Sequence, residues 1–256
     1  MAERDRRLYD SISSTYTTTR RPDPRITARI AAALGNAGRV VNIGAGTGNY
    51  EPADRPVVAV EPSAAMLAGR GTQAAPAVQA VAERLPFTDG SFDVAMATLT
   101  LHHWRELLVG LQEMRRVAER QVILLFDPGR ISLLWAMQYW PEALRLPSEI
   151  DAPGPEKVAE ALDVREVRTV PIPNDCTDGF GAAFWGRPEA YLHPEIQAGM
   201  SWLAQLPAPV LAEGADLLRR DLRSGAWDDR YGHLRRLPEL DVGYRLILAG
   251  GPTRPI

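Results

Sequence analysis

The chain has 256 residues, enough to bury a substantial core, and its formal net charge of −3 excludes a strongly basic, nucleic-acid-binding protein. Hydrophobic residues make up 45% and charged residues 24%, as in ordinary globular domains, and no apolar run approaches the ~20 residues that cross a bilayer. Cys176 is the only cysteine, which excludes an internal disulfide, and the N-terminal segment lacks the apolar core of a secretory signal. We therefore expect a cytoplasmic protein that binds neither nucleic acid nor membrane.

Basic residues are almost all arginine: Lys157 is the only lysine among the 29. The arginines are scattered along the chain rather than clustered, which argues against a dedicated phosphate-binding patch. The skew is typical of a GC-rich genome, and we expect a bacterial source.

Short apolar strands alternate with helical patterns in the first half of the chain. The predicted strands cover residues 39–43, 57–60, 78–81, 92–101 and 122–126. Helices are predicted from Pro24, after Ser63 and around Leu111, each with apolar residues at helical spacing. This alternation predicts a mainly parallel sheet covered on both faces, which also explains why the strands are continuously apolar.

The second half of the chain has a looser pattern. Helices are predicted for residues 133–146, 156–162, 194–206 and 210–222, and strands for residues 164–172 and 242–249. We expect one α/β domain with a doubly wound, mainly parallel sheet and a helical cap inserted before the last strand. Its expected parts are an N-terminal helical lid at 1–37, a cofactor-binding core at 38–173, the cap at 174–237, and the last strand and tail at 238–256.

A glycine-rich loop at residues 44–48 follows the first predicted strand, and Glu61 stands at the end of the second. Glycine is needed where a strand turns abruptly and where a ligand lies against the backbone, and a carboxylate after the next strand can accept hydrogen bonds from ribose hydroxyls. NAD and S-adenosylmethionine both fit this geometry. The dinucleotide fingerprint G-x-G-x-x-G requires glycine where Asn49 stands, so the spacing favours S-adenosylmethionine.

Four sequence blocks resemble the class I S-adenosylmethionine-dependent methyltransferases, in particular small-molecule members with a methyltransferase domain of type 11 or 25. The blocks cover residues 40–48, 58–67, 82–93 and 101–104. The resemblance implies the Rossmann-like class I methyltransferase fold. It also implies transfer of a methyl group from S-adenosyl-L-methionine to an O, N or C nucleophile of a small molecule, with S-adenosyl-L-homocysteine as the product. A bacterial specialised metabolite is the expected kind of acceptor.

The same resemblance implies which residues contact the cofactor. They are Tyr16, Arg20, Gly44, Ala45, Gly46, Gly48, Glu61, Pro62, Met66, Ala82, Glu83 and Thr98. Glu61 would hold the ribose hydroxyls, and Pro62 and Met66 would line the adenine. Two acids common in the family are replaced here, by Asn42 and Val81, so a charge near the loop and an acceptor for the adenine amino group are lost.

The catalytic candidates are His102, His103 and Asp175. An imidazole titrates near neutral pH, so either histidine could be a general base, with His103 favoured; alternatively, the pair only orients its loop. Asp175 and Asp178 follow a predicted strand, where they could contact the acceptor or simply form an Asx turn and helix cap. The substrate-binding candidates are Tyr9, Trp104, Asp178 and Trp185, although an aromatic residue of the cap could equally belong to its core. We expect no metal site.

Two other classes of function remain open. A binding protein or non-methylating catalyst could keep S-adenosylmethionine as a scaffold, and the replacements at Asn42 and Val81 leave room for it. An NAD-dependent oxidoreductase would use a similar loop, but no tyrosine precedes Lys157 at the spacing of a Tyr-x-x-x-Lys catalytic pair. The favoured reading is a monomeric or homodimeric enzyme whose partner is a small-molecule methyl acceptor.

Overall fold

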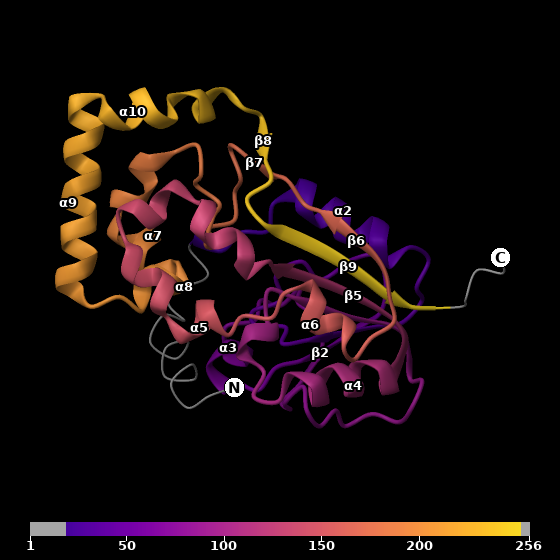
Figure 1. Ribbon diagram of the computed structural model, residues 1–256. Helices are drawn as coiled ribbons and strands as arrows, with labels where there is room; N and C mark the ends of the chain where they lie inside the picture. Colours follow the sequence, from indigo (N-terminus) through magenta and orange to yellow (C-terminus); the bar gives the residue numbers. More distant parts are fainter. Residues whose placement is uncertain (1–18, 252–256) are drawn as a thin grey trace.

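The computed structural model describes residues 19–251, within which seven strands form one sheet of order β3-β2-β1-β4-β5-β9-β6 (Figure 1). The strands are β1 (Val40–Ile43), β2 (Val57–Val60), β3 (Ala77–Val78), β4 (Phe92–Thr98), β5 (Ala118–Phe126), β6 (Val164–Thr169) and β9 (Tyr244–Gly250). Neighbours from β3 through β5 are parallel, whereas β9 is antiparallel to both β5 and β6. The predicted doubly wound, mainly parallel sheet is confirmed.

The strand order reverses at β1. The chain runs outward from β1 to β2 and β3 and then returns to place β4 on the other side of β1. In open α/β sheets, ligands bind outside the carboxyl ends of the strands at such a reversal. The ends of β1, β2 and β4 are therefore the expected position of the site.

Helices cover both faces of the sheet, and Figure 1 shows α2 (Pro24–Leu34) and α4 (Leu107–Val117) on opposite sides of it. Alternate residues of β4 point to opposite faces: Met96 packs in the core with α2, and Ala97 packs in the core with α4. Asp23 caps α2 by accepting a hydrogen bond from the Arg25 N–H. Of the expected N-terminal lid, residues 1–18 lie outside the described residues, and α2 packs against the sheet.

The cap is built from the residues between β6 and β9. It begins and ends with β7 (Ile172–Pro173) and β8 (Glu239–Leu240), which pair antiparallel. Between them come η5 (Pro188–Leu192), α7 (Pro194–Gly199), α8 (Ser201–Ala204), α9 (Ala208–Ser224), α10 (Ala226–Tyr231) and η6 (Gly232–Arg236). Figure 1 shows α9 and α10 on the side of the cap away from the sheet.

The segment after β5 joins the cap, but the helix predicted for residues 133–146 is wrong. The chain forms short turns η2 (Pro128–Leu133), η3 (Trp135–Gln138) and η4 (Pro141–Arg145), followed by α5 (Pro147–Ile150). Pro141 and Pro147 each lack a backbone donor and would clash inside a continuous helix. The turns still bury their aromatic residues, since Trp135 packs edge-on against Trp227 and Trp140 against Trp202. Figure 1 shows α5 and α6 (Pro155–Ala159) between the cap and the core. None of the helices formed by residues 19–251 has the length and apolarity that crossing a bilayer demands.

Candidate functional site

The loop after β1 turns through glycines with left-handed backbone, at φ 71° for Gly44, 53° for Gly46 and 101° for Gly48. A Cβ atom on Gly44 would lie 2.0 Å from Thr100 Oγ1, so the residue after β4 leaves no room for a side chain there. A Cβ atom on Gly46 would meet no described atom within 4 Å, because that side of the loop is open. The loop therefore presents bare backbone to the carboxyl ends of β1 and β4.

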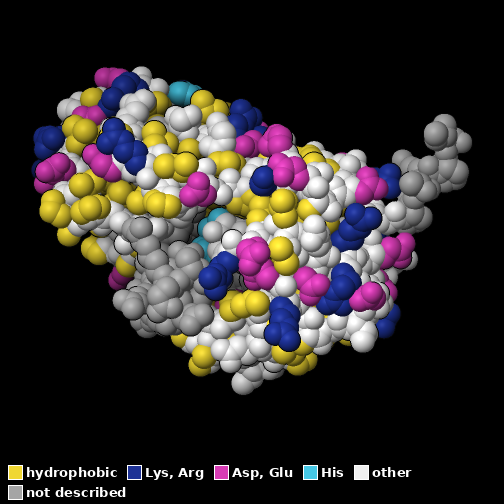
Figure 2. Space-filling view, turned by 60° about the horizontal axis from the view of Figure 1, so that its bottom comes forward, with side chains coloured by type: hydrophobic (Ala, Val, Ile, Leu, Met, Phe, Trp, Pro, Cys, Tyr) yellow, Lys and Arg dark blue, Asp and Glu magenta, His cyan; other side chains and the backbone are white. Residues whose placement is uncertain are grey.

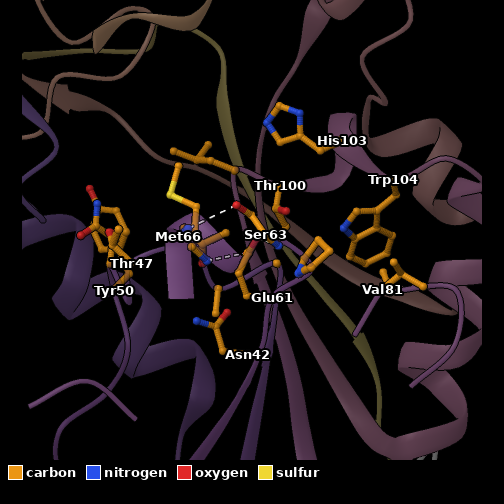
Figure 3. Close-up of a pocket in the computed structure, with 18 of the residues that line it drawn as sticks. Asn42, Thr47, Tyr50, Glu61, Ser63, Met66, Val81, Thr100, His103 and Trp104 are labelled. Atoms are coloured by element: carbon orange, nitrogen blue, oxygen red, sulfur yellow. Dashed lines mark hydrogen bonds between the residues drawn. The ribbon is translucent and has the colours of Figure 1, made fainter. Parts of the chain in front are cut away.

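Glu61 ties this loop to the end of β2. Its two carboxylate oxygens accept hydrogen bonds from the Gly46 N–H (2.8 Å) and the Ser63 N–H (2.9 Å). The side chain is buried, and burial raises the pKa of Glu61 although both N–H groups oppose the shift. A carboxylate has more lone pairs than these two bonds use, so Glu61 can also accept from a ligand. Figure 3 shows it in the centre of the cavity described next.

A first cavity of about 880 Å³, its mouth included, opens over the glycine loop. It brings together most of the residues assigned to the cofactor by resemblance: Arg20, Gly44, Ala45, Gly46, Glu61, Pro62, Met66, Ala82, Glu83 and Thr98. Gly48 belongs to the loop but packs against Glu51 and is not among the described lining residues. Tyr16 lies outside the described residues.

Asn42 and Val81, the residues that stand where the family commonly has acids, both line this cavity. Asn42 Oδ1 is buried and has no hydrogen-bond partner among residues 19–251, while Asn42 Nδ2 donates to Glu51 Oε1 at 3.1 Å. An unpaired buried acceptor of this kind fits a ligand that brings a donor, such as an amino group. Val81 lines the cavity on the same side as Trp104, as Figure 3 shows, and this apolar end fits a planar ring. Trp104 was expected to contact the acceptor, but its position lies in this first cavity.

Glu51 and Arg70 support the loop, and sequence reasoning missed them because both lie outside the four matching blocks. Their side chains are each 7% exposed, and Arg70 Nη2 lies 2.8 Å from both Glu51 carboxylate oxygens. Arg70 Nη1 also donates to the Gly46 carbonyl at 3.0 Å. This buried pair therefore holds the glycine loop and Asn42 in a fixed relation.

A second cavity of about 930 Å³ adjoins the first and shares Arg20, Leu99 and Thr100 with it. Its remaining walls come from the ends of β4 and β5, from α5 and from the cap, and they are mainly apolar and aromatic. The largest are Phe126, Ile131, Leu134, Phe180, Trp202 and Tyr244. The space-filling view in Figure 2 shows a hollow in the molecular surface with histidine atoms at its bottom.

The two neighbouring histidines, His102 and His103, line different cavities. His103 lines the first and His102 the second, with ring centroids 3.7 Å apart. Burial, followed by the influence of His103 and Arg20, lowers the pKa of His102 well below its usual range. Its imidazole is therefore neutral at neutral pH and able to accept a hydrogen bond.

The other predicted residues of the described chain, Asp175, Asp178 and Trp185, are not among the residues that line either cavity. The Asp175 side chain is 81% exposed and pairs with Arg25 at 2.7 Å. Asp178 is fully buried and bonds to Arg20, and Trp185 is buried in the cap, where its Nε1–H donates to the Ile172 carbonyl at 2.9 Å. Tyr9 lies outside the described residues. Over residues 19–251, no cluster of side chains is suited to hold a metal ion.

Comparisons with known proteins agree with this geometry. A family model described as a methyltransferase domain matches residues 41–126. A crystal structure of a candidate methyltransferase from an antibiotic biosynthesis pathway of Anabaena variabilis is 34% identical, with a TM-score of 0.80, over 91% of this chain and 99% of that one. Comparison with curated proteins gave no match.

More distant structures share the fold. A candidate methyltransferase of Haloferax volcanii, solved in complex with the methyltransferase activator Trm112, is 14% identical over 98% of this chain and 99% of that one, with a TM-score of 0.55. Geranyl diphosphate C-methyltransferase of Streptomyces coelicolor, solved with S-adenosyl-L-homocysteine, is 13% identical over 88% of this chain and 77% of that one, with a TM-score of 0.50. On the 34% identity over nearly its whole length and the matching methyltransferase domain, the chain belongs to the class I S-adenosylmethionine-dependent methyltransferases.

Proposed function

We propose that the protein transfers a methyl group from S-adenosylmethionine to an O, N or C nucleophile of a small molecule. The observation that carries this proposal is the pair of adjoining cavities, one over the glycine loop and one with apolar walls, which share Arg20, Leu99 and Thr100. A bacterial specialised metabolite is the proposed acceptor, which agrees with the antibiotic pathway named for the Anabaena relative. The enzyme would act in the cytoplasm as a monomer or homodimer.

The first cavity would hold the cofactor, which supplies a methyl group already activated on a sulfonium. Glu61 would bind the ribose hydroxyls of the cofactor. Asn42 Oδ1 has no partner within the described chain and would accept a hydrogen bond from an amino group of the cofactor. Met66, Val81 and Trp104 would enclose the adenine. The bare backbone at Gly46 allows the ligand to approach closely.

The second cavity would hold the acceptor, with the residues shared by the two cavities where they meet. Much of the catalysis of methyl transfer comes from holding the nucleophile in line at near-attack distance. His102 lines this cavity as a neutral imidazole, so it would accept a hydrogen bond from the acceptor and orient it. His103, which lines the first cavity, would contact the cofactor.

Calorimetry with S-adenosyl-L-homocysteine and NAD side by side tests the cofactor assignment. We expect micromolar binding of S-adenosyl-L-homocysteine and none of NAD; the reverse result would overturn the proposal. Incubation with methyl-labelled cofactor and a panel of small acceptors then tests transfer. Cofactor binding without transfer to any acceptor would support the scaffold alternative instead.

A further inference from the structure

The second cavity contains an acidic residue, Glu149, which the sequence does not distinguish. Helix α5 (Pro147–Ile150) carries it, and it is the only acidic side chain among the described residues that line this cavity. Within residues 19–251 its side chain accepts a single hydrogen bond, a long one of 3.4 Å from the Ser148 hydroxyl to Glu149 Oε1. No ion pair of Glu149 is found in the described part of the chain.

The other polar groups among the described residues of this cavity provide no compensating charge for the carboxylate. Arg20 is already paired with the buried Asp178, at 2.5 Å. His102 is held neutral mainly by burial, with a further effect of Arg20. Burial raises the pKa of Glu149 to about 7, so a substantial fraction is ionised at neutral pH. Glu149 is half-buried, and a partly desolvated carboxylate is costly unless it is paired, so a cation supplied by the ligand would stabilise it.

The walls around Glu149 suit a positively charged group attached to an apolar body. Phe180 and Tyr244 line the cavity with ring centroids 4.6 Å apart, and Trp202 lines it from the cap. Burial, with a smaller effect of the Glu149 charge, raises the pKa of Tyr244 well above its usual range, so its phenol stays neutral. Aromatic faces attract cations, and more strongly when water is excluded.

We propose that the second cavity binds a methyl acceptor with an apolar or aromatic body and a basic nitrogen, and that Glu149 is the counterion of that nitrogen. The inference rests on the proposed function, because it names the acceptor class of the same site. The ammonium proton passes to the Glu149 carboxylate, and the freed lone pair on nitrogen forms the N–C bond. The sulfonium C–S bond breaks with its electron pair remaining on sulfur, and the methylated nitrogen carries the positive charge.

Matched amine and alcohol probes test the proposal. The pairs are 2-phenylethylamine with 2-phenylethanol, 3-phenylpropylamine with 3-phenylpropan-1-ol, and tryptamine with tryptophol. Binding to the full chain is measured by calorimetry with saturating S-adenosyl-L-homocysteine. In the wild type we expect at least one amine to bind about tenfold more tightly than its alcohol, the size of one charge-assisted hydrogen bond. Glu149→Gln should remove this preference, whereas Glu142→Gln, at an exposed acid on the preceding turn, should retain it.

The wild-type measurement decides the inference even if a variant folds poorly. If no amine binds more tightly than its alcohol, or if Glu149→Gln keeps the preference, the inference is overturned. Methylation of an alcohol that is lost in Glu149→Gln would also overturn it, since Glu149 would then act as a base for a hydroxyl. The affinity for S-adenosyl-L-homocysteine separates the two proposals. If S-adenosyl-L-homocysteine binds but no amine is preferred over its alcohol, only the acceptor class is contradicted. If S-adenosyl-L-homocysteine does not bind, the proposed function is contradicted.

Discussion

Arg20 and Asp178 form an ion pair that joins the beginning of the described chain to the beginning of the cap. Arg20 Nε lies 2.5 Å from Asp178 Oδ1, and the two residues also form an isolated antiparallel bridge. The Tyr50 hydroxyl donates to the other carboxylate oxygen at 2.7 Å. Because Arg20 lines both cavities and Tyr50 follows the glycine loop, this pair fixes the boundary between the two cavities.

Replacing Asp178 by Asn should therefore destabilise the fold strongly. The Asp178 side chain is 0% exposed, and the variant leaves Arg20 without this carboxylate. We expect a loss of about 3 kcal/mol in the free energy of unfolding, measured by urea denaturation. Tyr50→Phe, which removes only one hydrogen bond, should lose about 1 kcal/mol. Equal losses in the two variants would contradict the ion pair's role.

Glu61→Gln should weaken cofactor binding because the charged acceptor for the ribose hydroxyls is lost. We expect the affinity for S-adenosyl-L-homocysteine to fall by about 1–3 kcal/mol, as seen for hydrogen bonds to charged groups. The measurement is calorimetry, with Glu119→Gln, an exposed acid on β5, as the matched control. An unchanged affinity would refute the assigned role of Glu61. Urea denaturation of the variant shows how much of the effect comes from the bonds to Gly46 and Ser63.

The central strands of the sheet could be predicted well from sequence, because they are mostly buried and therefore form apolar runs. Residues 57–60, for example, form β2 over exactly the predicted range. The reversal of β9 was not predicted, since an apolar run does not reveal its direction. The helix predicted for residues 133–146 is wrong, because Pro141 has no N–H to continue a helix and a separate short turn begins there.

The site was predictable where local motifs build it and not where distant segments meet. The glycine loop and Glu61 lie in matching sequence blocks and line the same cavity. The Arg70 contact with Glu51 and the position of Glu149 in the second cavity depend on tertiary packing, and neither leaves a local signal. Likewise, nothing in the sequence distinguishes Asp175, which is exposed, from the buried Asp178.

The glycine loop allows a test that separates stability from binding. Gly44→Ala places a Cβ atom 2.0 Å from Thr100 Oγ1 in left-handed backbone, so we expect a loss of at least about 2 kcal/mol in unfolding free energy. Gly46→Ala has open space, so the left-handed backbone should cost only about 1 kcal/mol. Its methyl group should nevertheless weaken S-adenosyl-L-homocysteine binding measurably.

Gly71→Ala is the control for both glycine variants, since a Cβ atom there would meet no described atom within 4 Å and the backbone is not left-handed. Gly71→Ala should change neither the free energy of unfolding nor the affinity for S-adenosyl-L-homocysteine. Full cofactor affinity in Gly46→Ala would show that the ligand does not approach the loop backbone at this point.

Glu149 should make stability depend on pH in a defined direction. Burial raises its pKa from the ordinary 4.5 to about 7, so the folded protein keeps this proton where the unfolded chain has lost it. The protonated Glu149 therefore contributes fully to the free energy of unfolding below about pH 4.5. This contribution, up to about 3 kcal/mol, is lost as the pH rises through about 7. The variant Glu149→Gln keeps the other titratable groups of this cavity, which are Arg20, His102 and Tyr244. Their effect on stability is therefore common to the wild type and the variant.

The difference in unfolding free energy between wild type and Glu149→Gln isolates this residue. Urea denaturation at pH 5, 6, 7 and 8 should show the wild type losing stability relative to the variant as the pH rises. A difference that stays constant over this range would contradict a carboxylate with a raised pKa.

The two histidines should have separable effects on methyl transfer, because they line different cavities. His102→Gln removes the neutral imidazole facing the second cavity, which can accept a hydrogen bond that orients the acceptor, so we expect kcat to fall about tenfold with the affinity for S-adenosyl-L-homocysteine unchanged. His103→Gln, in the first cavity, should weaken cofactor binding and change kcat less. The measurements are steady-state transfer from labelled cofactor and calorimetry. A loss of kcat confined to His103→Gln would contradict the acceptor site placed next to His102.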